Sequence, residues 1–165
     1  MKRVSCLAAA AAAALAVLLV GCTEGGDDEQ AEPVLQSVAA LDVYPGVAAQ
    51  VIDALAEAYP EVTWTPPEER ESRVVSTDDE GCVLLVGPIG GTPSLLGEAG
   101  SWSRIAETVA PVLESNDFAP IEGEDELEGG WTGVRTTDET GAVLRLYDKG
   151  GVELTLRVRV TDPSC

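Results

Sequence analysis

The last part of the chain carries the strictest hydrophobic alternation in the sequence. Between residues 152 and 160, valine or leucine occupies every even position, and glutamate, threonine or arginine occupies every odd one. Successive side chains of a β-strand point to opposite faces of the sheet, so this period of two predicts a strand with one buried face and one wet face. A sheet with one solvated face is typical of antiparallel pairing. We therefore expect an antiparallel sheet that is covered on one side.

Two segments with a helical period can supply that cover. The first has apolar residues at every fourth position and ends at Pro60, and the second begins after Ser101, a residue type that caps helix N-termini. Pro111 lies inside the second segment, and Asn116-Asp117 provides its end. The apolar stripes are Val47, Val51, Leu55 and Tyr59 in the first helix, and Ile105, Val109 and Leu113 in the second.

A hairpin pattern follows each of these helices. Residues 76–86 and 136–146 both read [ST]-T-D-[DE]-x-G-x-V-L-x-[VL]. An acidic turn with glycine between β-branched runs predicts a hairpin, because glycine accepts the positive φ that such a turn needs. We expect an α+β two-layer sandwich, an antiparallel sheet with two helices on one face, which could contain a duplicated helix–strand–strand unit. Coincidence of common turn chemistry is the alternative explanation of the repeat.

The first 22 residues have the pattern of a secretory signal. Lys2 and Arg3 precede 14 apolar residues, and Leu19-Val20-Gly21-Cys22 ends the run. An apolar stretch of this length is shorter than the ~18–20 residues that span a bilayer. The segment resembles the lipobox of bacterial lipoproteins, which implies a diacylglycerol on Cys22 and cleavage before it. An uncleaved membrane anchor is the alternative.

This interpretation divides the chain into three parts. Residues 1–21 are the signal peptide, residues 22–33 are an acidic flexible tether, and residues 34–165 form a single α+β domain. The expected location is the cell membrane, with the domain lipid-anchored on the extracytoplasmic face. After cleavage, 8 basic residues face 29 acidic ones. Such a net charge repels nucleic acid, so we expect no nucleic-acid partner.

The four cysteines separate by position. Cys6 leaves with the signal peptide and Cys22 carries lipid, which leaves Cys82 and Cys165. In an oxidising compartment these two are expected to form a disulfide that closes a loop of 84 residues. Two free thiols are the alternative.

The sequence contains no recognisable catalytic or cofactor motif. The absence of histidine removes Ser-His-Asp and Cys-His catalysis and histidine-ligated metals. The acidic run from Glu122 to Glu128 lacks the spacing of an EF-hand, so we interpret it as a solvated loop rather than a Ca²⁺ site. We expect no catalytic residue, no metal and no cofactor.

Three features could contact a partner. The segment from Gly87 to Gly100 has no periodicity, and long loops are often functional. Its candidate contact residues are Ile89, Gly90, Gly91, Thr92 and Ser94. The three tryptophans, Trp64, Trp102 and Trp131, each flank an expected element, where rim-of-core packing is the commoner role and an exposed stacking platform the rarer one. Arg145, Arg157 and Arg159 could form a basic stripe on the wet face, paired with neighbouring acids.

Taken together, these features resemble the LppA-like lipoproteins of actinobacteria. The residues that carry the resemblance are the lipobox, the acidic tether, the helix that ends in Pro60-Glu61-Val62-Thr63-Trp64, the Gly81-Cys82 strand and the closing Cys165. The resemblance implies an extracytoplasmic α+β lipoprotein from a family with no established activity, so it assigns no functional residues.

We expect a cell-envelope binding or interaction module whose partner is an envelope protein or a wall polymer. One alternative is a carrier that encloses a small apolar ligand between helices and sheet. The other is a carboxylate-only hydrolase, which needs two acids facing a cleft.

Overall fold

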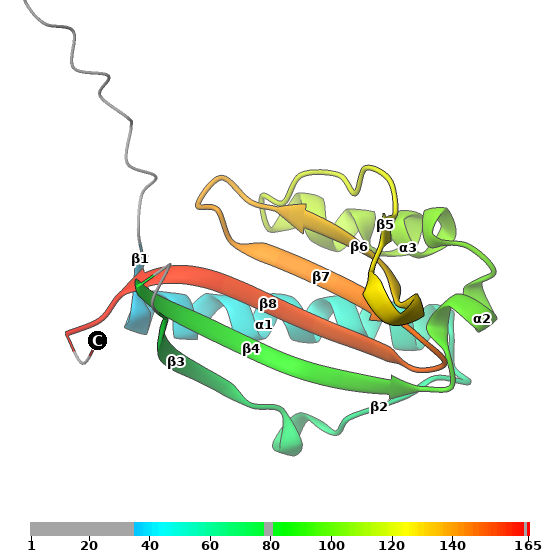
Figure 1. Cartoon of the computed structure of the whole chain (residues 1–165), viewed down its shortest axis with the longest axis horizontal. Helices are drawn as coiled ribbons and strands as arrows, with labels where there is room; N and C mark the ends of the chain where they lie inside the picture. Colours follow the sequence, from blue (N-terminus) through cyan, green and yellow to red (C-terminus); the bar gives the residue numbers. More distant parts are fainter. Residues whose placement is uncertain (1–34, 78–80, 164) are drawn as a thin grey trace, which may run out of the picture. The chain divides into compact units, whose positions relative to one another are not determined.

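The strands form one open sheet, and the alternating C-terminal strand lies at its centre. The computed structural model describes residues 35–77, 81–163 and 165. The strands are β1 (Leu35–Gln36), β2 (Thr63–Trp64), β3 (Ser72–Thr77), β4 (Gly81–Thr92), β5 (Asp125–Glu126), β6 (Thr132–Thr137), β7 (Val143–Asp148) and β8 (Val152–Thr161). β8 lies between β4 and β7 (Figure 1), and the order across the sheet is β2-β4-β8-β7-β6-β5. β3 pairs with the first half of β4, and β1 pairs in parallel with the end of β8. The remaining pairs are antiparallel, which confirms the expected α+β class.

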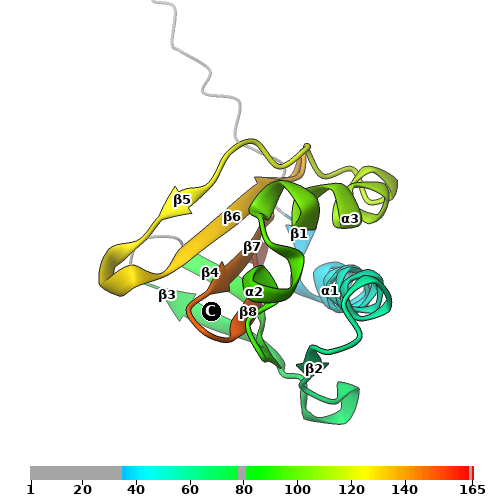
Figure 2. The ribbon, with the colours of Figure 1, turned by 90° about the vertical axis from the view of Figure 1, so that its right-hand side faces the viewer.

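The helices are α1 (Ser37–Ala58), α2 (Leu95–Ala99) and α3 (Trp102–Ser115). Figure 2 shows α1 and α3 on the same side of the sheet. The predicted start of α3 is confirmed, because the Ser101 hydroxyl accepts a hydrogen bond from the Arg104 amide at 3.3 Å. α1 begins earlier than its apolar stripe and continues through Pro45.

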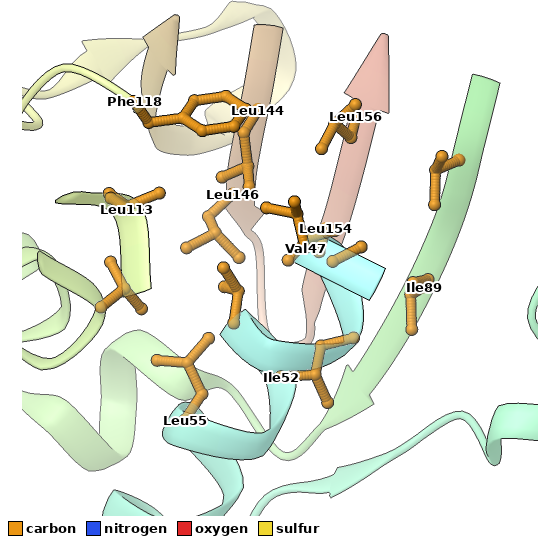
Figure 3. Close-up of a cluster of buried hydrophobic side chains, with 14 of the residues drawn as sticks. Val47, Ile52, Leu55, Ile89, Leu113, Phe118, Leu144, Leu146, Leu154 and Leu156 are labelled. Atoms are coloured by element: carbon orange, nitrogen blue, oxygen red, sulfur yellow. The ribbon is translucent and has the colours of Figure 1, made fainter. Parts of the chain in front are cut away.

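The hydrophobic core lies between helices α1 and α3 and one face of the sheet. The stripe residues of α1 and α3 are buried as the periodicity predicts, except that Tyr59, which follows α1, is only partly buried. The even-numbered residues of β8 are buried as well. Figure 3 shows the contact of the layers: Val47, Ile52 and Leu55 of α1, Ile89 of β4, Leu144 and Leu146 of β7, Leu154 and Leu156 of β8, Leu113 of α3, and Phe118. Burial of each leucine contributes about 1.5–3 kcal/mol to the stability of the fold. The main role of this face of the sheet is therefore to stabilise the domain.

By length and composition α1 could cross a membrane, with a mean hydropathy of 1.3 over its most apolar window. Eight of its residues, from Ser37 to Leu55, are nevertheless buried. In this structure α1 is the core helix of the domain, and it lies on the sheet.

Both expected hairpins are present. β3 and β4 form one, β6 and β7 form the other, and the two hairpins flank β8. Gly81 and Gly141, which occupy equivalent positions in the repeated pattern, have φ values of 72° and 79°. The sequence pattern therefore coincides with a structural one, in which a long helix precedes each hairpin.

The predicted disulfide joins Cys82 to Cys165. It connects the start of β4 to the segment after β8. In that segment the backbone carbonyl oxygen of Asp162 accepts a hydrogen bond from the Cys165 amide at 3.2 Å. The lipidation residue Cys22, like the rest of residues 1–34, lies outside the described residues.

Candidate functional site

The expected contact loop is not a loop, and this prediction is wrong. Residues 87–92 are the second half of β4, and Ser94 caps α2 by accepting the Gly97 amide at 2.9 Å. Ile89 is 1 % exposed and belongs to the core. Of the five candidate residues only Thr92 is exposed; Gly90, Gly91 and Ser94 are partly buried.

Two glycines of this segment, Gly87 and Gly91, are explained by the close approach of neighbouring atoms. A Cβ on Gly91 would lie 2.7 Å from a methyl of Val152 and 3.0 Å from the Trp64 ring. A Cβ on Gly87, at the bulge of β4, would lie 2.7 Å from the Leu154 carbonyl oxygen. Glycine inside a strand often marks such a bulge or close contact rather than a flexible loop.

The two acids with the most hydrogen bonds, Asp148 and Asp138, have structural roles. Asp148, 5 % exposed, accepts hydrogen bonds from Ser94 at 2.7 Å, from the Leu96 amide and from the Gly150 amide. It therefore joins the start of α2 to the β7–β8 turn. The oxygens of this carboxylate are thus satisfied by hydrogen bonds within the fold.

Asp138 has the same structural role at the β6–β7 turn. Its carboxylate accepts the amides of Thr140 and Ala142 and the hydroxyl of Tyr44, which lies 2.7 Å away on α1. Burial is the main cause that raises the pKa of Tyr44 to about 12, and the nearby Asp138 raises it further. The pair attaches α1 to the turn of the second hairpin.

The face of the sheet opposite the helices has a concentration of positive charge that is larger than the expected stripe of three arginines. Residues that pair across neighbouring strands share a face, and the registers place five arginines on the face opposite the core. We call these residues the arginine face: Arg73 on β3, Arg135 on β6, Arg145 on β7, and Arg157 and Arg159 on β8. The described chain has eight basic residues, so more than half of them lie on this one surface.

Few acids accompany these arginines on the strands. Asp125 pairs with Arg135 at 3.3 Å, and Glu153 lies at the far end of β8. Arg73 pairs with Glu71, which precedes β3, at 3.0 Å, and both side chains are exposed. Arg157 and Arg159 also have interaction partners. The acidic turn residues 78–80 lie outside the described residues.

Arg145 has two other arginines of this face as close cross-strand neighbours. It lies directly opposite Arg135 and diagonally from Arg157, whose cross-strand partner is Val143. Like charges directly opposite each other on neighbouring strands destabilise a sheet. Arg145 makes no ion pair with any described residue, and it is half-buried. Its charge therefore carries a local electrostatic cost, which the Arg135–Asp125 ion pair reduces.

A hollow of about 370 Å³ accompanies this cluster. Its lining includes the side chains of Arg145, Arg157 and Arg159 together with Val83 and Val143. Asp138 lines one edge, where its oxygens are already hydrogen-bonded. Arginine presents a planar fork of donors that matches carboxylate and phosphate groups, so the hollow is suited to an anionic group.

Aromatic side chains lie at the other end of the same face. Tyr147 is directly opposite Glu153, and these two residues line a hollow of about 220 Å³ with Trp131 and Leu127. A Cβ on Gly133 would lie 2.7 Å from Cδ1 of Tyr147, so the glycine leaves room for the tyrosine ring across β6. Leu127 is 38 % exposed, so it adds apolar surface to this hollow.

The three tryptophans have different environments. Trp102 is buried and donates from Nε1 to Thr132 at 3.0 Å, and Trp64 packs against the core with its Nε1 unpartnered among the described residues. These two have the expected rim-of-core role, whereas half-buried Trp131 lines the aromatic hollow.

Sequence reasoning identified Arg145, Arg157 and Arg159 but missed Arg73, Arg135 and the aromatic hollow. Side chains alternate between the two faces along residues 72–77 and 132–137. Once the strand register is known, this alternation assigns Arg73 and Arg135 to the wet face. Within the described residues, no cluster of three or more acids and cysteines has the geometry to hold a metal ion.

The fold and this face define an α+β domain with a sheet covered on one side only. No family model matches the chain, and no curated protein is significantly similar to it. Among solved structures, the chain is similar to the crystal structure of a DUF4853 family protein from Actinomyces odontolyticus. The two share 13 % identity with a TM-score of 0.44, over 73 % of this chain and 70 % of that one. This distant likeness has no part in the functional argument.

Proposed function

We propose that this chain is a lipid-anchored, extracytoplasmic binding module of the bacterial cell envelope, and that its arginine face binds an anionic partner. The lipobox-like segment ending at Cys22 supports the anchor. The observation that carries the binding proposal is the arginine face itself. A chain with net charge −19 keeps five of its few cations on one solvated sheet surface, including a like-charged pair opposite each other.

The physical argument rests on the distribution of charge. An acidic protein repels anions at long range, so an anion binds only where local positive charge outweighs that field. The arginine face provides such a place, because charge-assisted hydrogen bonds to arginine contribute about 1.5–3 kcal/mol each. A binding module on a tether needs only such a surface, and no catalytic group.

The alternatives are less well supported by the described residues. A carrier of an apolar ligand needs open space between helices and sheet, but that interface is filled by the core side chains shown in Figure 3. A carboxylate-only hydrolase needs two acids facing a cleft, whereas Asp138 and Asp148 each bond to backbone amides in separate turns.

The binding proposal is tested with the full chain, extracted from membranes in a neutral detergent. Its affinity is measured for immobilised polygalacturonate, polyphosphate and uncharged dextran at low and high salt. We expect binding to the two polyanions, none to dextran, and weakening as salt screens the charges. The Arg145→Gln/Arg157→Gln double variant should lose at least about tenfold in affinity, since two charge-assisted contacts disappear. Arg104→Gln, on α3, is the control and should bind like the parent.

Two results would overturn the binding proposal: no affinity for either polyanion at low salt, or unchanged affinity in the double variant. The anchor is tested separately by Cys22→Ser. This variant should lose incorporated fatty acid and leave the membrane fraction. Equal membrane retention by the parent and Cys22→Ser, with no lipid on either, would refute the anchor.

A further inference from the structure

The aromatic hollow has the chemical composition of a sugar subsite. Trp131 and Tyr147 provide ring surfaces, Leu127 extends the apolar floor, and the Glu153 carboxylate lies beside them. The face of an aromatic ring is electron-rich, so it attracts the slightly positive C–H bonds on one face of a pyranose. A carboxylate at the edge can accept hydrogen bonds from the sugar hydroxyls.

Lys149 is close to the same place. A Cβ built on Gly129 would lie 3.9 Å from Lys149 Nζ and 4.0 Å from Cδ1 of Trp131. The lysine ammonium can donate to hydroxyls, or pair with an acidic substituent on the sugar. The hollow therefore combines stacking surfaces with one acceptor group and one donor group.

The aromatic hollow and the arginine cluster lie along the same two strands, β7 and β8. On the open face, Tyr147 lies opposite Glu153, Arg145 lies opposite Thr155, and Val143 lies opposite Arg157. From Glu153 to Arg159, six residues of β8 cover about 20 Å at the usual strand rise. This distance exceeds the reach of one monosaccharide, so a ligand that occupies both ends must be an oligomer.

We propose that the ligand of the arginine face is an anionic glycan, a chain of sugar rings with carboxylate or phosphate groups. One ring stacks in the hollow between Trp131 and Tyr147, and the acidic groups further along the chain bind Arg145, Arg157 and Arg159. This inference rests on the proposed function, because it specifies which class of anion that surface binds. Gly133 is a positioning residue, since it leaves space for the ring of Tyr147.

The test compares three polyanions on the full chain in neutral detergent. Polygalacturonate has sugar rings and carboxylates, polyglutamate has carboxylates without sugar rings, and polyphosphate has neither rings nor carbon. The variants are Trp131→Ala and Tyr147→Leu, with Trp131→Phe and Tyr147→Phe as matched controls that keep the ring surface.

We expect the parent to prefer polygalacturonate to polyglutamate of similar length. Trp131→Ala and Tyr147→Leu should lower the affinity for polygalacturonate about threefold to tenfold, the range typical of one aromatic contact. Both phenylalanine variants should retain most of that affinity. Binding of polyphosphate should stay unchanged in all four variants, which also shows that the arginine face remains folded.

The outcomes separate the two proposals. If the parent binds no polyanion, the proposed function fails and the glycan inference fails with it. If the parent binds polyglutamate as tightly as polygalacturonate and the aromatic variants change neither, the face binds anions but not as a glycan site. That second result would point to an acidic protein segment and would overturn the inference alone. If polygalacturonate is preferred and the aromatic variants weaken its binding, a phosphorylated glycan in its place distinguishes phosphate-bearing from uronate-bearing chains.

Discussion

Replacing Arg145 should make the domain more stable while it weakens binding. Arg145 lies opposite Arg135 and diagonally from Arg157, without an ion-pair partner among the described residues. Cross-strand charge pairs contribute roughly 0.2–1 kcal/mol each. Removing one repulsive pair and one weaker diagonal contact by Arg145→Gln should therefore raise the free energy of unfolding by about 0.5–1 kcal/mol. Glutamine keeps most of the stem, so little packing is lost.

The measurement is urea unfolding at low and high salt, with Arg104→Gln as the control. Both substitutions change the net charge equally, so their difference isolates the local repulsion from the general acidity of the chain. The difference should shrink in about 1 M salt, where the Debye length is only ~3 Å. If Arg145→Gln is less stable than Arg104→Gln at low salt, Arg145 has a stabilising role and our account of the arginine face is wrong.

Three further predictions concern the fold that supports this face. Replacing both Cys82 and Cys165 by alanine should lower the free energy of unfolding by about 4.5 kcal/mol in the chain-entropy model for a loop of 84 residues; a loss under about 1 kcal/mol in urea unfolding would contradict it. Because the folded-state pKa of Tyr44 is raised to about 12 from an ordinary value of 10, unfolding should become easier as the pH rises from 10 to 12, by roughly 2–3 kcal/mol at most. Tyr44→Phe should remove this part of the pH dependence, and an unchanged profile would refute the assignment. Gly133→Ala should destabilise the domain by about 1–3 kcal/mol and displace the ring of Tyr147, because the new methyl meets backbone and ring atoms; wild-type stability with unchanged Tyr147 fluorescence would contradict the close approach.

The sequence predicted the fold where the pattern was local. The alternation of residues 152–160 needs only the geometry of one strand, and both its faces are as expected. The stripes of α1 and α3 are local in the same sense, so each is buried along its length. The start of α1 at Ser37 was not predicted, because the apolar stripe begins only at Val47.

The sequence did not predict the role of a residue where that role depends on neighbours that are distant along the chain. Gly87 and Gly91 suggest a loop when only the sequence is considered. In the folded sheet they are needed because Leu154, Val152 and Trp64 approach them closely. Trp131 and Tyr147 are 16 positions apart, and the β6–β7 register brings them to one hollow. Arg135 joins the arginine face for the same reason, since its register with Arg145 decides which face it occupies.

The central claim is tested most directly by watching the arginine side chains. The full chain is labelled with ¹⁵N-arginine in neutral detergent, and the Nε–Hε signals are followed by NMR while polygalacturonate is added. We predict that the signals of Arg145, Arg157 and Arg159 shift in a saturable way, while Arg104 on α3 does not respond. Shifts confined to Arg104, or no shift of the arginine-face signals at saturating polymer, would contradict the claim that this face is the binding site.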